Sequence, residues 1–196
     1  MYVDVCFPKN NEEQFILVAE SVGIKGLCFL YDENFPVKNK ISELKEKSNV
    51  KLFFCSYGKK IKGSDGEFNI NITRDIRKES IYVFDYMSEV NKSFHMPLKE
   101  INQVIMKDLA EMNCLVCIKF SKKSEYEKNP EIIEKIKFVL ELCEKYSVNL
   151  CCSSFAKNPY DLRNSVMLNS FFRLIFPNNN IIKRSFFSLD KHLLSN

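Results

Sequence analysis

The feature that most constrains the fold is the alternation of short apolar runs with longer segments whose apolar residues recur at helical spacing. A short apolar run bounded by turn residues is typical of a buried strand, and strands that alternate with helices form βαβ units with a mainly parallel sheet. The strand-like runs are at residues 2–6, 26–31, 50–57, 81–85, 114–120 and 150–152. The helical segments are at residues 11–22, 36–48, 98–112, 130–146 and 165–176.

Two regions are harder to interpret. Residues 58–80 combine lysines and glycines with an alternating apolar pattern, so they form either a hairpin or a fourth strand. After an Asn-rich turn at 178–180, we expect a last short strand at Ile181–Ile182 and a terminal helix that contains Leu189, Leu193 and Leu194. About seven such units in a chain of 196 residues suit a small or incomplete TIM-like (β/α) barrel. We expect a single domain that spans residues 1–196.

Composition and charge exclude several classes of protein. Hydrophobic residues make up 45% and charged residues 28% of the chain, which indicates a folded protein. No apolar run is long enough to span a bilayer, and the first residues carry no basic-then-apolar signal pattern. The segment after the first strand, residues 6–11, has no glycine, which disfavours a dinucleotide-binding or P-loop enzyme. A net charge of +4 is compatible with nucleic acid without requiring it.

The eight cysteines fall mostly in the apolar runs, so we expect reduced, buried thiols that act as small hydrophobic side chains. Cys114 and Cys117 have the spacing of a zinc clip. In a strand, however, residues three apart point to opposite faces, so one metal ion cannot bind both. We expect no metal and no cofactor.

The stretch from Val148 to Arg163 reads as a buried strand that ends in a loop. Two adjacent hydroxyls, Ser153 and Ser154, follow the strand, and the loops at the carboxyl ends of parallel strands are where binding groups gather. A nucleophilic serine needs a base, and the chain has only two histidines, His95 and His192. We therefore expect the hydroxyls to bond backbone groups.

The segment Ser153-Ser154-Phe155-Ala156, followed by Leu162-Arg163, resembles the Ser-Ser-x-Ala … Leu-Arg signature of a protein subunit of ribonuclease P. That family comprises the thirty-kilodalton-class protein of eukaryotes and the component 3 protein of archaea. Residues 3–8 resemble its opening strand, and residues 94–98 and 116–121 resemble its eukaryotic branch. The chain departs from the family at Cys117, where a glutamate is expected.

This resemblance implies a (β/α) barrel of the polymerase-and-histidinol-phosphatase type that does no chemistry. It implies a subunit that pairs with a small α/β protein and supports a catalytic RNA, which removes the 5′ leader of precursor tRNA. In eukaryotes the same subunit is shared with RNase MRP. The implied location is the nucleus (nucleolus), which we favour, or the cytoplasm if the chain is archaeal, with no membrane partner.

Basic side chains are what such a protein offers to RNA, because they neutralise phosphates without reading sequence. Among them we favour Arg163, whose planar guanidinium can grip two phosphate oxygens. Its alternative role is to bond loop carbonyls near Asp161. The candidate RNA contacts are Lys59, Lys60, Lys62, Lys119, Lys122, Lys123, Lys157, Arg163, Lys183 and Arg184, and the motif residues are Ser153, Ser154 and Ala156.

Two other functions stay open. A metal-dependent phosphoesterase on the same barrel would need several converging ligands, beginning with a His-x-His after the first strand. The first strand here carries Asp4-Val5-Cys6 instead, which disfavours that function. A barrel used as a protein-binding scaffold is the second alternative. RNA binding that weakens steeply with salt would distinguish an RNA partner from a protein partner.

Overall fold

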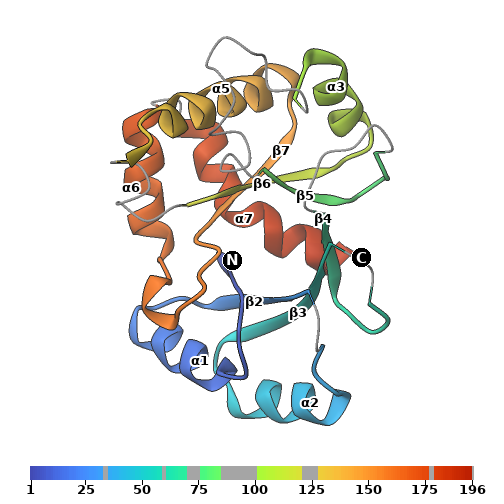
Figure 1. Cartoon of the computed structure of the whole chain (residues 1–196), viewed down its shortest axis with the longest axis vertical. Helices are drawn as coiled ribbons and strands as arrows, with labels where there is room; N and C mark the ends of the chain where they lie inside the picture. Colours follow the sequence, from blue (N-terminus) through green and yellow to red (C-terminus); the bar gives the residue numbers. More distant parts are fainter. Residues whose placement is uncertain are drawn as a thin grey trace.

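The computed structural model describes residues 1–32, 35–58, 61–69, 76–84, 101–120, 128–176 and 179–195. Within them, one sheet of seven strands follows the order of the chain, and each strand pairs in parallel with the next (Figure 1). The strands are β1 (Val3–Cys6), β2 (Gly26–Tyr31), β3 (Lys51–Tyr57), β4 (Gly66–Asn69), β5 (Ile81–Phe84), β6 (Leu115–Lys119) and β7 (Asn149–Ser153). This is the predicted α/β architecture.

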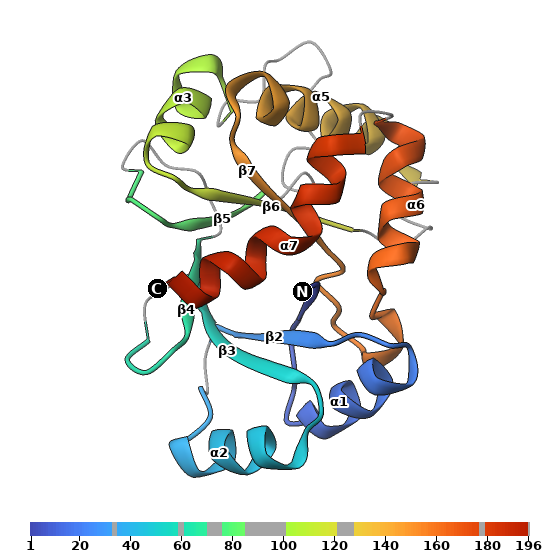
Figure 2. The same ribbon diagram turned by 180° about the vertical axis from the view of Figure 1, so that it is seen from behind.

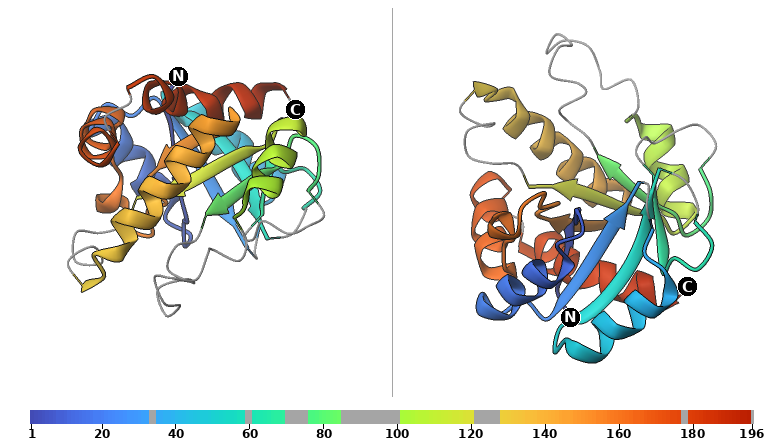
Figure 3. Two further views of the ribbon diagram at one scale, coloured as in Figure 1. Left: turned by 90° about the horizontal axis from the view of Figure 1, so that it is seen from above. Right: turned by 60° about the horizontal axis from the view of Figure 1, so that its bottom comes forward.

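Helices surround the curved sheet, as Figure 3 shows from two further directions. In Figure 1, α1 and α2 lie below the strands, α3 and α5 lie above them, and α6 stands to the left. Figure 2 shows α7 crossing the sheet on the other side of the molecule. The helices are α1 (Glu12–Ser21), α2 (Lys38–Lys47), α3 (Gln103–Glu111), α5 (Glu131–Tyr146), the 3-10 turn η2 (Pro159–Asp161), α6 (Ser165–Ile175) and α7 (Asn179–Ser195).

Apolar residues fill both faces of the sheet, as a parallel sheet covered on both sides requires. Alternate strand residues pack outward against the surrounding helices, for example Phe29 and Phe54. The residues between them, such as Cys28, Phe53 and Cys55, form a separate cluster in the barrel interior. The interior positions are therefore set by the two-residue period of each strand.

Helix α7 covers the end of the barrel at which the strands begin. Its Leu189 and Leu193 belong to the interior cluster, and its His192 Nε2 lies 2.8 Å from the carbonyl of Glu79, just before β5. Gly66 at the start of β4 allows this approach, because a Cβ there would lie 2.8 Å from Leu193 Cδ2. With this end covered, the carboxyl ends of the strands form the other opening.

The barrel is incomplete between its first and last strands. β1 and β7 share no ladder, and an isolated parallel bridge joins Cys6 to Ala156 just beyond β7. The Phe7 amide donates to the Ala156 carbonyl at 2.8 Å, and the Ala156 amide donates to the Val5 carbonyl at 3.0 Å. The predicted small or incomplete TIM-like barrel is confirmed.

Several local predictions can be compared directly. Residues 58–80, left open between a hairpin and a fourth strand, contain β4, which is parallel to both neighbours. The predicted strand at Ile181–Ile182 is wrong: both residues lie in α7, where Ile182 is buried as part of a helical stripe. The expected turn residues Asn179 and Asn180 are its first residues. In the described part of the chain, no helix combines the length and apolarity that crossing a membrane requires.

Candidate functional site

The gap between β1 and β7 is closed by side chains, and the carboxylate of Asp4 lies at its centre. Asp4 is fully buried on β1. Its Oδ1 accepts hydrogen bonds from the Ser153 hydroxyl at 2.6 Å and from the Ser154 amide at 2.8 Å. Its Oδ2 accepts from the Ser154 hydroxyl at 2.7 Å. The two adjacent serines therefore bind β7 to a strand about 150 residues away in the sequence.

Further donors complete this network. The Tyr2 hydroxyl and the Val5 amide donate to Asp4 Oδ1 at 2.9 and 3.0 Å, and the Arg163 amide donates to Oδ2 at 3.1 Å. The Val5 amide also donates to Ser153 Oγ at 2.7 Å. Burial, followed by the nearby Asp4 charge, raises the pKa of Tyr2 well above its usual value, so its hydroxyl stays a donor. We call Asp4, Ser153 and Ser154 the closing seam.

Ser153, Ser154 and Ala156 have a structural role, because their bonds join β7 to β1. Both hydroxyls are buried and bonded to Asp4, and Ser153 also accepts from a backbone amide, in line with the expectation of backbone bonding. Ala156 forms an isolated parallel bridge with Cys6 across the gap between β1 and β7. In the described residues, the Ser-Ser-x-Ala motif is thus the device that closes the barrel.

Arg163 lies beside β1 and not at the carboxyl end of a strand, where sequence reasoning placed it. Its backbone bonds Asp4 and accepts from the Tyr2 hydroxyl at 3.0 Å, because the loop after β7 folds back along β1. The guanidinium Nη1 donates to the carbonyls of Tyr160 and Leu162 at 3.0 and 2.8 Å. The Arg163 side chain thus bonds loop carbonyls on either side of Asp161, which is the alternative role that the sequence suggested for it.

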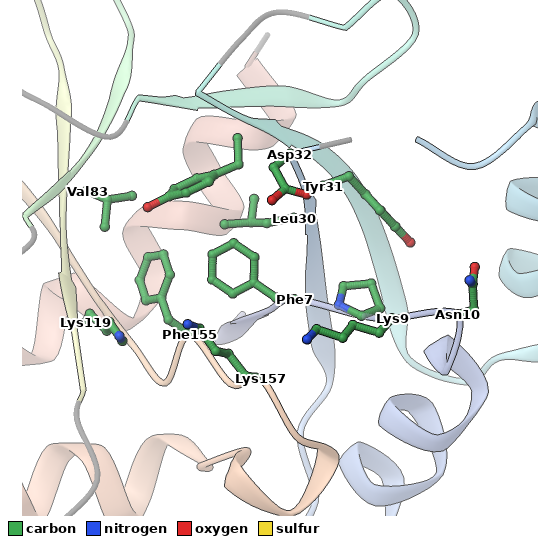
Figure 4. Close-up of a pocket in the computed structure, with 12 residues that line it drawn as sticks. Phe7, Lys9, Asn10, Leu30, Tyr31, Asp32, Val83, Lys119, Phe155 and Lys157 are labelled. Atoms are coloured by element: carbon green, nitrogen blue, oxygen red, sulfur yellow. The ribbon is translucent and has the colours of Figure 1, made fainter. Parts of the chain in front are cut away.

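The carboxyl ends of the strands surround a cavity of about 580 Å³, which we call the mouth (Figure 4). Its volume is within the range of roughly 300–1,000 Å³ that is common for ligand pockets. Leu30 and Val83 come from within β2 and β5, and the other lining residues end or follow strands. Those are Phe7, Pro8, Lys9, Asn10, Tyr31, Asp32, Tyr57, Lys119, Phe155 and Lys157.

Aromatic rings fill the centre of the mouth. The half-buried Phe7 ring packs edge-on against Tyr57, with ring centroids 5.2 Å apart, and lies 6.3 Å from the Phe155 ring. Phe155 also packs edge-on against Phe68 in the interior. Its φ of 49° lies in the left-handed region, which bulky side chains rarely adopt. The chain thus holds a strained backbone that keeps this ring in the mouth.

Three lysines reach the mouth from three different elements. Lys9 follows β1, Lys119 ends β6 and Lys157 follows β7, and Figure 4 shows their ammonium groups along the same side of the two Phe rings. Asp32 lies on the opposite side in that view. Lys9 and Lys157 are exposed and Lys119 is half-buried. Among the residues that the structure describes, the mouth therefore has more cationic than anionic side chains.

A partly buried ion pair supports one wall of the mouth. Glu12 at the start of α1 is 3% exposed, and both of its oxygens accept from Lys40 Nζ at 3.1 Å. The Tyr31 hydroxyl donates to Glu12 Oε1 at 3.1 Å. Burial and then the Glu12 charge raise the pKa of Tyr31 above its usual value. This network connects the end of β2 to α1 and α2.

The structure distributes the predicted RNA contacts over different surfaces. Lys119 and Lys157 meet at the mouth. Lys183 and Arg184 are on α7, where Arg184 lines a cavity with Asn113 and Asn149 near the beginnings of β6 and β7. Lys62 is exposed before β4. The predictions for Lys59, Lys60, Lys122, Lys123 and also His95 fall outside the described residues.

Sequence reasoning missed Lys9, Phe7 and Phe155 as lining residues. Lys9 could have been found by the rule that placed Lys119 and Lys157, since it follows the end of β1 directly. The rings could not be found in that way, because Phe7 and Phe155 resemble ordinary core residues in the sequence. The contact between them depends on the bridge that joins β1 to the segment after β7.

The cysteines are buried and free, as predicted. Cys114 and Cys117 belong to different core clusters, which confirms that they lie on opposite faces of the sheet. Burial raises the pKa of Cys143 and Cys152, which makes both thiols poor nucleophiles. In the parts of the chain that the structure describes, no group of three or more His, Cys, Asp or Glu side chains has the arrangement of a metal site.

The sequence and the fold can be compared with known proteins. No family model matches the sequence, and no curated protein matches it either. Among solved structures, the chain is similar to one chain of the cryo-EM structure of archaeal ribonuclease P with mature tRNA, with a TM-score of 0.72. The similarity covers 98% of this chain and 90% of that chain at 14% sequence identity. The two chains therefore share a fold over almost their whole length.

Proposed function

We propose that this chain is a protein subunit of ribonuclease P. The observation that carries the proposal is the shared fold with a chain of an archaeal ribonuclease P structure over 98% of the sequence. A fold alone does not select a function, because (β/α) barrels have many. The residue-level support is the Ser-Ser-x-Ala … Leu-Arg signature, which resembles that of the thirty-kilodalton-class and component 3 subunits.

The closing seam explains why such a signature is needed. A barrel of seven strands leaves the edges of β1 and β7 without a ladder, and unpaired buried backbone groups destabilise a fold. Ser153, Ser154 and Ala156 supply the bonds across this gap, and the Arg163 amide adds one from the returning loop. The signature therefore matches the fold for a physical reason, which adds to its weight as a family feature.

In this proposal the chain does no chemistry, and the RNA of the particle removes the 5′ leader from precursor tRNA. Among the described residues, the strand ends that line the mouth carry Phe7, Tyr57 and Phe155 with three lysines and one carboxylate, that of Asp32, which supports this role. Such a surface attracts phosphates. The partners in this role are the ribonuclease P RNA and a small α/β protein subunit, with precursor tRNA reached indirectly.

The proposal extends to RNase MRP and to the nucleus if the chain is eukaryotic. The residues at 94–98 and 116–121 that resemble the eukaryotic branch support this part. A eukaryotic subunit of this family would be shared between both particles and would accumulate in the nucleolus. An archaeal chain would act in the cytoplasm with ribonuclease P alone.

Sequencing of the bound RNA tests the proposal. The tagged chain is purified from its own cells under native conditions, and the RNA is compared with that from a tagged unrelated protein of equal charge. We expect strong enrichment of the ribonuclease P RNA, together with a small protein subunit seen by mass spectrometry. Enrichment of MRP RNA as well would support the shared role. A preparation without either RNA would refute the proposal.

A further inference from the structure

The mouth combines two features: an aromatic surface and a set of converging ammonium groups. Phe7 and Phe155 lie at its centre, and Lys9, Lys119 and Lys157 come to it from three separate elements. The rings offer an apolar surface, and the lysines offer charge at a short distance from it. A ligand that matches both must carry a flat apolar part and a negative part.

We propose that the mouth binds an unpaired nucleotide of an RNA strand, with the base against the Phe7 ring and the flanking phosphates at the lysines. This inference rests on the proposed function, because it names which part of an RNA the barrel would hold. Proteins that bind single strands use this combination, in which bases stack on aromatic rings and a cationic groove follows the backbone. The bases of a duplex are already stacked and cannot reach a ring in a cavity.

Phe7 is the ring best placed to receive a base. It is half-buried and lines the cavity, and its edge-on contact with Tyr57 fixes its orientation. Phe155 is 2% exposed, so it acts as the wall behind Phe7 and contributes less surface of its own. Backbone hydrogen bonds at Ser154 and Ala156, the two neighbours of Phe155, fix the position of Phe155 beside β1.

The three lysines indicate the path that the RNA strand takes across the mouth. Lys9 and Lys157 are exposed on the two segments that the bridge between Cys6 and Ala156 brings together. Lys119 lies on the adjacent β6 and is half-buried. A strand that crosses the mouth from β1 toward β6 would therefore pass Lys9, Lys157 and Lys119 with its phosphates. Asp32 on the far side would repel those phosphates and so keep the backbone on the lysine side.

Binding of a labelled short oligouridylate, measured by fluorescence anisotropy at several salt concentrations, tests the inference. Phe7→Ala removes the ring, and we expect about tenfold weaker binding, because the variant loses the stacking of one base. Phe138→Ala is the matched control, because Phe138 is 43% exposed on α5 and does not line the mouth. Circular dichroism must show that both variants remain folded.

The charges are tested by the salt dependence. A single-strand contact contributes a slope of about 0.7 per phosphate to the plot of log affinity against log salt. Lys9→Ala combined with Lys157→Ala should therefore reduce the slope by about 1.4 between roughly 50 and 200 mM salt. Lys137→Ala, an exposed lysine on α5, should leave it unchanged.

The outcomes separate this inference from the proposed function. If Phe7→Ala and Phe138→Ala bind oligouridylate equally, or if a short RNA duplex or uridine monophosphate binds as tightly as the oligomer, the mouth is not a site for an unpaired RNA nucleotide. The subunit role stands in that case as long as the chain still retrieves ribonuclease P RNA from its cells. Absence of that RNA refutes the subunit role whatever the oligomer does.

Discussion

Replacing Asp4 with alanine removes the centre of the closing seam, and the structure predicts how much stability is lost. Six hydrogen bonds end on the Asp4 carboxylate. Among the described residues, Asp4 is the acceptor recorded for three of these donors: the Ser153 hydroxyl, the Ser154 amide and the Arg163 amide. The other donors have a second acceptor, as the Val5 amide has in Ser153 Oγ.

The magnitude follows from these three donors. Each buried donor left without an acceptor costs roughly 1–3 kcal/mol, so the Ser153 hydroxyl and the Ser154 amide together give roughly 2–6 kcal/mol, and the part-buried Arg163 amide adds less. The loss is partly offset because the variant no longer buries a carboxylate. We therefore expect the free energy of unfolding to fall by about 3 kcal/mol or more, a large part of the roughly 5–15 kcal/mol that a domain has. Ser153→Ala removes one donor and one acceptor and should cost about 1 kcal/mol.

Urea unfolding followed by circular dichroism measures these differences. Ser170→Ala is the control, because the Ser170 hydroxyl bonds only a carbonyl of its own helix, that of Val166, on the exposed side of α6. We expect it to stay within about 0.5 kcal/mol of the unmodified chain. If Asp4→Ala were as stable as Ser170→Ala, the seam would not be what closes the barrel, and the reasoning would be refuted.

Three further predictions concern charge, burial and pH. Arg163→Ala should lower the affinity for RNA or the activity of the assembled particle while thermal stability stays nearly the same, because the guanidinium bonds two carbonyls of its own loop, those of Tyr160 and Leu162. Unchanged activity would remove Arg163 from the candidate RNA contacts. Lys40→Ala leaves the Glu12 carboxylate buried without its cation, and because the Lys40 side chain is 38% exposed the cost should lie between about 1 kcal/mol, as for an exposed pair, and about 3 kcal/mol, as for a buried one. Removal of both charges by Glu12→Gln with Lys40→Met should cost less, and equal losses would contradict the argument from the buried carboxylate. Raised thiol pKa values mean that the folded chain keeps protons that the unfolded chain releases above about pH 8.5. Stability should therefore be nearly constant below about pH 8 and fall by about 1 kcal/mol per thiol between roughly pH 8 and 9.5. A urea midpoint that does not move over that range would count against burial of the thiols of Cys6, Cys28, Cys143 and Cys152.

The alternation of strands and helices was predictable because each element carries a clear period. The apolar runs at β2, β3 and β6 could be assigned only as strands, and the stripe of apolar residues on α5 only as a helix. The barrel was predicted from the number of strand–helix units in a short chain. The error at Ile181 and Ile182 has a physical origin. Two adjacent apolar residues fit a strand or a helix equally well, and the spacing of Ile182, Phe186, Leu189 and Leu193 was the helical signal.

The site was predictable in part. The rule that binding groups follow the ends of parallel strands brought Lys119 and Lys157 to the mouth. The same rule failed for Arg163, because a loop that turns back along β1 has no signature in the sequence. The bond between Asp4 and Ser153 was also out of reach of local reasoning, since it joins the two ends of a barrel whose closure no short segment encodes.

Cleavage of precursor tRNA by the native particle tests whether its RNA does the cutting. The particle is purified through this chain, divided, and assayed for release of the 5′ leader with and without prior digestion of its RNA by micrococcal nuclease. We expect leader release by the intact particle, none after digestion, and none from the chain purified free of RNA. Leader release by the RNA-free chain would contradict the claim that the RNA does the cutting, and an intact particle without activity would contradict its place in ribonuclease P.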